Sequence, residues 1–116
     1  MHNFKELKVW QKSIDLTTQI YSALSCFPSD EKYGLVSQMK RAAVSIPSNI
    51  AEGCGRKSNK ELKYFLSINL GSAFELETQL IVAHRLNLME QTKMNDIELK
   101  ISEIQKMIFS LERSFI

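Results

Sequence analysis

Apolar residues recur every three or four positions along nearly the whole chain, which is the spacing of one face of an α-helix. Four segments carry this pattern, at about residues 5–26, 30–53, 58–86 and 95–114. The segments between them are short, so neighbouring helices should run antiparallel. The pattern predicts an all-α fold, an up-and-down antiparallel four-helix bundle that forms one domain over residues 1–116.

The first segment has two adjacent apolar stripes that together widen its predicted buried face. One stripe includes Trp10 and Tyr21, so both aromatic side chains are predicted to lie in the core. The second stripe comprises Val9, Leu16, Ile20 and Ala23.

Pro47 lies inside the apolar pattern of the second segment. Proline lacks a backbone donor, and its ring clashes with the preceding helical turn. The periodicity nevertheless continues from Leu35 to Ile50. We therefore expect one helix that is kinked near Pro47.

The third segment begins with Ser58 followed by Glu61, a capping box. Asn69 falls within its apolar stripe, and a buried amide of this kind can fix register or oligomeric state. Gly71 lies mid-helix, where glycine costs about 1 kcal/mol relative to alanine. We expect it to allow close contact with the second helix.

Charge is unevenly distributed, although the net charge of the chain is only +2. Residues 40–63 include six basic and two acidic residues, a net charge of +4, whereas the rest of the chain has nine basic and eleven acidic residues. Such a patch suits phosphate groups, but a solvated hairpin tip is the alternative. Arg41 is expected near Glu75, either ion-paired with it or free. The nucleic-acid-binding hypothesis names Lys40, Arg41, Arg56, Lys57, Lys60 and Lys63.

The third segment also carries apolar residues outside its core stripe. A helix that is apolar nearly all round is usually buried on more than one side. These residues therefore predict self-association, with scattered exposed apolar side chains as the alternative. The predicted oligomer interface comprises Tyr64, Ile68, Phe74 and Ile81.

Residue patterns for catalysis and metal binding are missing from the sequence. Cys54 is expected at a helix C-terminus, where the dipole disfavours a thiolate, and no histidine is placed to activate it. The Glu-x-x-His pair of di-iron bundles is not formed at His84. We expect no enzymatic activity, no cofactor, no metal and no small-molecule substrate.

The sequence also predicts the cellular location of the protein. It has no run of about 18 apolar residues that would span a membrane. The first ten residues do not resemble a signal peptide, and the two cysteines form no C-x-x-C motif. These features predict a cytoplasmic protein with no membrane association.

Three strings, LKVWQKS, YGLVSQMKRAAVSIPSNIAEGCGR and FLSINLGSAFELETQLIVAHRL, resemble the bacterial 23S rRNA-intervening-sequence protein family, also called the four-helix bundle protein family. The resemblance covers roughly residues 4 to 115, and RAAVSIPSNIAEG is its most specific part. It implies a four-helix bundle, a homo-oligomer that in several members is a homopentamer, and similarity to a basic nucleic-acid-binding accessory protein of retroelements. It supplies no catalytic residues.

Two functional hypotheses follow. The first is a non-enzymatic oligomeric bundle that binds RNA or DNA through the basic residues. The second is a structural scaffold that recruits a protein partner through the third helix.

Overall fold

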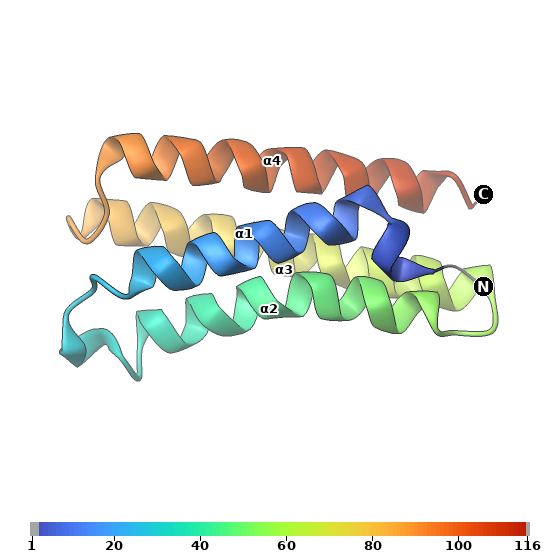
Figure 1. The fold of residues 1–116 in the computed structure, drawn as a ribbon, viewed down its shortest axis with the longest axis horizontal. Coiled ribbons are helices and arrows are strands. Elements are labelled where there is room, and N and C mark those ends of the chain that lie inside the picture. The colour runs from blue at the N-terminus through green and yellow to red at the C-terminus, as the bar shows by residue number, and fades with distance from the viewer. Residues whose placement is uncertain (1–2, 116) are drawn as a thin grey trace.

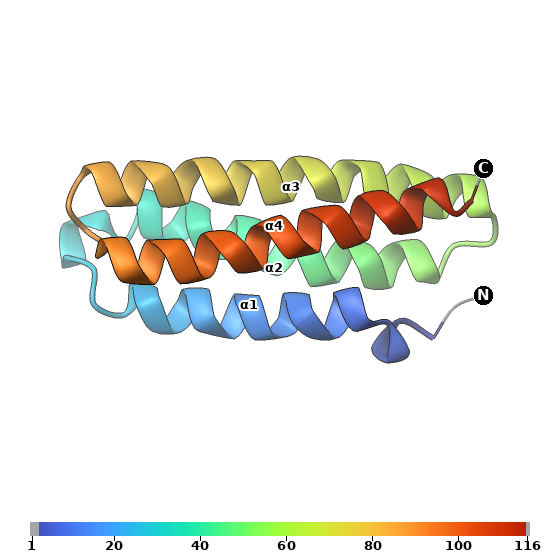
Figure 2. The ribbon, with the colours of Figure 1, turned by 90° about the horizontal axis from the view of Figure 1, so that it is seen from above.

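Four long helices run alternately up and down and pack side by side into a bundle (Figures 1 and 2). The computed structural model describes residues 3–115. The predicted four-helix bundle is confirmed. The helices are α1 (Lys8–Leu24), α2 (Leu35–Cys54), α3 (Asn59–Arg85) and α4 (Gln91–Arg113), with two short 3₁₀ helices, η1 (Phe4–Glu6) and η2 (Ser29–Glu31).

Several helix boundaries differ from the predicted ones. Leu7 is extended and separates η1 from α1, so the first long helix begins later than expected. Helix α2 begins at Leu35 because the backbone of Gly34 is not helical and separates α2 from η2. Helix α4 begins one turn earlier than predicted, at Gln91. The start of α3 is confirmed: Ser58 Oγ accepts a hydrogen bond from the Glu61 backbone N–H at 3.2 Å.

The core is a continuous column of aliphatic side chains contributed by all four long helices. In α1 the centre of the buried face is the stripe of Val9, Leu16, Ile20 and Ala23. The prediction that Tyr21 is a core residue is wrong, since its side chain is exposed and Lys40 Nζ lies 4.9 Å from the centre of its ring. Trp10 is half-buried and packs edge-on against Phe4. The largest fully buried side chains are Leu16, Ile20, Met39, Ile46, Ile50, Leu66, Leu76, Leu80, Ile97, Ile101, Ile104 and Ile108.

The close contact between α2 and α3 is made at Gly53, and the prediction for Gly71 is wrong. Gly71 faces open space, and a Cβ atom added there would meet no atom within 4 Å. A Cβ atom at Gly53 would lie 2.9 Å from Leu62 Cδ1 and 3.0 Å from Phe65 Cβ. Gly53 therefore lets the two helices approach next to their connecting turn.

Helix α2 continues through Pro47, as predicted, and the expected kink stays a prediction. Proline leaves the carbonyl group four residues earlier, that of Ala43, without its helical donor. The hydroxyl of Thr17 in α1 partly compensates, because its single proton is shared between Ala43 O, at 3.1 Å, and Ser13 O of its own helix, at 2.7 Å. The helical defect in α2 is thus covered by a side chain of a neighbouring helix.

Asn69 is fully buried, and its amide links α3 to α2. Its Nδ2 atom donates a hydrogen bond to Ile46 O at 3.0 Å. Since the bond joins two helices in an otherwise apolar interior, it penalises sliding of one helix along the other. This geometry agrees with the structural role expected from the sequence.

Polar contacts hold α1 against α4 over part of their length only. Gln19 Nε2 donates to Asp96 Oδ2 at 2.6 Å, and Lys100 Nζ donates to Gln19 Oε1 at 2.7 Å. The hydrogen bond from Gln19 lowers the pKa of Asp96. Lys12 and Glu103 form an ion pair at 3.1 Å nearer the other end of α1. Beyond that pair, the two helices leave a groove between them.

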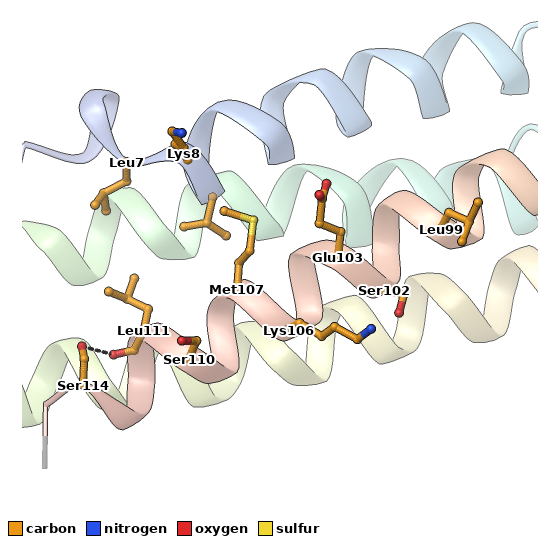
Figure 3. Close-up of a pocket in the computed structure, with 11 residues that line it drawn as sticks. Leu7, Lys8, Leu99, Ser102, Glu103, Lys106, Met107, Ser110, Leu111 and Ser114 are labelled. Carbon is orange, nitrogen blue, oxygen red and sulfur yellow. Dashed lines mark hydrogen bonds between the residues drawn. The ribbon is translucent and has the colours of Figure 1, made fainter.

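The groove has a volume of about 770 Å³. Met107 and Leu111 of α4 and Leu7 from the segment before α1 project into it, and Lys8, Lys106 and Glu103 lie around it (Figure 3). Its floor is therefore apolar and its rim charged. The remaining lining residues are Val9, Leu99, Ser102, Ser110 and Ser114.

Candidate nucleic-acid interface

The turn between α2 and α3 carries four of the six predicted basic residues. Lys57 lies in the turn itself, and Lys60 and Lys63 lie in the first turns of α3. Lys57 and Lys60 are exposed and Lys63 is half-buried. Within residues 3–115, none of these three lysines forms an ion pair. Their ammonium groups are therefore available to an external anion.

Arg56, the fourth base at this turn, is held by neighbouring side chains. Its Nη2 atom lies 2.9 Å from Glu52 Oε1, one helical turn earlier, in an ion pair. Its guanidinium carbon lies 4.8 Å from the centre of the Phe65 ring. Arg56 contributes charge, and its contacts also join the end of α2 to the start of α3.

Lys40 and Arg41 lie apart from this turn, so the six predicted residues form two groups along the bundle. They lie about 20 Å from the turn, given a rise of 1.5 Å per residue along α2. Lys40 stacks on Tyr21 of α1. Arg41 is exposed, and the predicted ion pair with Glu75 is not among those formed in the described part of the chain.

Two further lysines lie at the same end of the bundle. Figure 1 shows η1 at the same end of the bundle as the turn between α2 and α3, and η1 packs against α2. This brings the exposed Lys5 and Lys8 to that end, together with the acidic Glu6. Their position in the sequence does not associate these lysines with the turn, although antiparallel topology places the start of α1 and the end of α2 together.

The N-terminus of α3 adds backbone donors to the basic turn. The first backbone N–H groups of a helix have no partner within the helix, and the helix dipole favours negative charge near them. Ser58 Oγ accepts a hydrogen bond from one of these N–H groups, that of Glu61, and donates one to Glu61 Oε1 at 3.1 Å. Lys57 and Lys60 flank this helix start. We refer below to Arg56, Lys57, Lys60 and Lys63 as the basic turn.

The predicted oligomer interface is exposed for three of its four residues. Tyr64, Ile68 and Phe74 are 64%, 41% and 53% exposed, whereas Ile81 is half-buried. Val82 and Leu86 extend the exposed apolar surface toward the other end of α3. We refer to Ile68, Phe74, Val82 and Leu86 as the α3 stripe.

The described residues show no arrangement typical of a metal site or an activated thiol. Burial raises the pKa of the Cys54 thiol, which is the opposite of what a nucleophile needs. Cys26 is exposed and unpaired. Within residues 3–115, no three His, Cys, Asp or Glu side chains gather as metal ligands. No helix in that range is both long and apolar enough to cross a membrane.

Comparisons with known proteins agree on one family. No curated protein matches the chain. A crystal structure of a protein with unknown function from the S23 ribosomal protein family of Bacteroides thetaiotaomicron VPI-5482 is similar, with a TM-score of 0.81 and 25% sequence identity. The match covers 90% of this chain and 97% of that one. Residues 5–110 match the sequence profile of the 23S rRNA-intervening sequence proteins, and the chain belongs to that family.

Proposed function

We propose that this protein binds nucleic acid, without catalysing a reaction, through the basic turn at one end of the bundle. The observation that carries the proposal is the group of three lysines, Lys57, Lys60 and Lys63, which have no acidic partner within residues 3–115. Phosphate groups bind such charges and release counterions, and this release supplies most of the free energy. The nearby Lys5 and Lys8 enlarge the same electrostatic surface.

Fluorescence anisotropy with labelled RNA and DNA, titrated over roughly 50 to 300 mM salt, tests the proposal. Binding should weaken steeply with salt. The triple variant Lys57→Glu, Lys60→Glu and Lys63→Glu should lower affinity more than 10-fold and reduce the salt slope by about 0.7 to 0.9 for each lost phosphate contact, the values for single strands and duplex DNA. The matched control is Lys32→Glu, Arg85→Glu and Lys93→Glu, which changes net charge equally at the opposite end. Equal loss in both variants would refute a specific basic turn.

A second candidate function is a self-associating scaffold, and the α3 stripe favours it. The stripe surrounds Glu75, an exposed acid that forms no ion pair in the described range. The groove between α1 and α4 has an apolar floor, and Lys8 and Lys106 lie on its rim. We propose that the stripe of one copy occupies the groove of the next. Because the two surfaces differ, the contact is heterologous and builds a ring or a filament.

Light scattering after gel filtration tests self-association. The wild-type protein should elute at a multiple of 13.3 kDa. Val82→Glu should lower that mass without loss of helical circular dichroism, because it places a charge in the proposed contact. Leu99→Glu should act similarly from the groove side. A wild-type monomer at micromolar concentration would refute the scaffold.

A further inference from the structure

We infer that the basic turn prefers single-stranded nucleic acid and that a base stacks on Tyr64. The inference rests on the proposed function and names the class of nucleic acid. Tyr64 is assigned here to ligand binding, although the sequence pattern placed it in an oligomer interface. Three observations support the assignment: the exposure of the ring, its basic neighbours, and the contacts that support it from below.

The Tyr64 ring is exposed beside lysines that form no ion pair within residues 3–115. Its side chain is 64% exposed, and Lys60 lies one helical turn earlier on the same side of α3. Lys63 precedes it directly. An aromatic face next to free ammonium groups is the combination that proteins use to bind single strands, since each base stacks while its phosphate is neutralised. The α3 stripe continues beyond Tyr64 without further lysines.

The Tyr64 ring contacts Phe65, which in turn packs against the end of α2. The rings of Tyr64 and Phe65 meet edge to face, with centroids 5.8 Å apart. Phe65 in turn lies under the guanidinium group of Arg56, which is ion-paired with Glu52. Gly53 packs against Phe65 Cβ from α2. This series of contacts leaves the outer part of Tyr64 open while it limits the motion of its neighbours, so a base would meet a largely ordered surface.

Duplex nucleic acid does not offer the same contact. Bases in a duplex are stacked on both sides by neighbouring bases, so an exposed tyrosine ring reaches one only after unstacking. Lysine contacts to phosphate are available on either form. Phosphate binding therefore gives affinity for both, and stacking on Tyr64 gives the preference for a single strand.

The test compares a labelled oligonucleotide of about 12 nucleotides with its own duplex, a length within the range that single-strand binding sites cover. Wild-type protein should bind the single strand more tightly at equal salt. Tyr64→Ala should weaken single-strand binding roughly 5- to 100-fold, the effect of losing one stacked base, and leave duplex binding unchanged. Tyr64→Phe should retain the affinity, because it retains the ring.

Tyr33 provides the matched control. It is 88% exposed and has Lys32 Nζ 5.5 Å from the centre of its ring, but it lies at the opposite end of the bundle. Tyr33→Ala should therefore leave both affinities unchanged. A loss equal to that of Tyr64→Ala would show that any exposed tyrosine beside a lysine suffices, and would overturn the inference.

The remaining outcomes separate the inference from the proposed function. Binding of both nucleic acids with equal affinity and no effect of Tyr64→Ala would overturn the inference and leave the proposed function standing. Absence of binding to either at low salt would overturn both. If Tyr64→Ala weakens both forms equally and lowers the mass found by light scattering, Tyr64 acts through assembly and the inference fails.

Discussion

At the scale of single residues, alanine substitutions at Gly53 and Gly71 should change the free energy of unfolding in opposite directions. Gly71→Ala adds a methyl group in open space and should raise the free energy of unfolding by about 0.5–1 kcal/mol, since alanine is the better helix former. Gly53→Ala should lower it by about 1–3 kcal/mol, because Phe65 Cβ is close to the backbone and cannot easily move aside. Urea denaturation followed by circular dichroism measures both. Equal stability of the two variants would contradict the close contact at Gly53.

The same pair of glycines shows what the sequence can predict about a helix contact. A glycine in the middle of a helix, such as Gly71, suggests a close contact with a neighbouring helix. Whether Gly71 faces that neighbour depends on the rotation of α3 about its axis. A glycine between two stripes can face a neighbour or solvent. Gly53 lies near the end of its helix, where a glycine is also typical of a helix terminus. Its packing against Leu62 and Phe65 depends on how the hairpin closes, which no local pattern encodes.

At the scale of helices, Thr17 of α1 should stabilise α2 at Pro47. Thr17→Val removes the hydroxyl that donates to Ala43 O and should lower the free energy of unfolding by about 1–2 kcal/mol. The matched control is Thr18→Val, because the Thr18 hydroxyl donates to Asp15 O within the same helix, on its exposed side. Chemical denaturation measures both variants, and an equal loss in each would contradict a special role for Thr17.

A second substitution, which restores the backbone donor at position 47, tests the role of Thr17 more directly. In Pro47→Ala the new N–H group can bond to Ala43 O within α2, so Thr17→Val should cost less in that background than in the wild type. A double-mutant cycle isolates this coupling. Coupling near zero would show that the Thr17 hydroxyl stabilises α1 alone, through its contact with Ser13 O.

Helix positions followed from local signals, while the candidate site depended on how helices meet. The Ser58 cap lies where its sequence pattern predicts, because capping involves residues three apart. The six predicted basic residues fall into two groups, because Lys40 and Arg41 are near the turn in sequence but lie about 20 Å from it along α2. Lys5 and Lys8 were missed for the converse reason. They are distant in sequence, and the topology places them near the basic turn.

At the scale of the whole molecule, charge and apolar surface are separated in a way that suits two kinds of contact. Figure 2 shows the turn between α2 and α3 and the N-terminal segment at the same end of the bundle. The basic turn and the N-terminal lysines belong to these segments, while the exposed α3 stripe is spread along the length of α3. If copies associate through the stripe, each copy contributes its basic turn to one assembly. Several weak phosphate contacts then act together and raise the affinity for a long strand without any new contact.

Cys54 reports whether the bundle opens as one unit. It is the last residue of α2, it is buried, and burial raises the pKa of its thiol. The reactive form of a cysteine is the thiolate, so the folded protein should react slowly at Cys54. In a Cys26→Ser variant, modification by a thiol reagent should be orders of magnitude slower than modification of the exposed Cys26 in Cys54→Ser. The rate of Cys54 modification should rise with urea in parallel with the loss of helical circular dichroism.

The position of Cys54 gives this measurement a further meaning. Helix ends fray readily, and a fraying end of α2 would expose the thiol without unfolding the bundle. Gly53, however, packs directly against Leu62 and Phe65 of α3, so release of Cys54 requires this contact to break. Fast modification without urea would show that the end of α2 opens locally. Slow modification would mean that the surface beneath Tyr64 is already ordered before any strand binds, so that little ordering entropy is lost on binding.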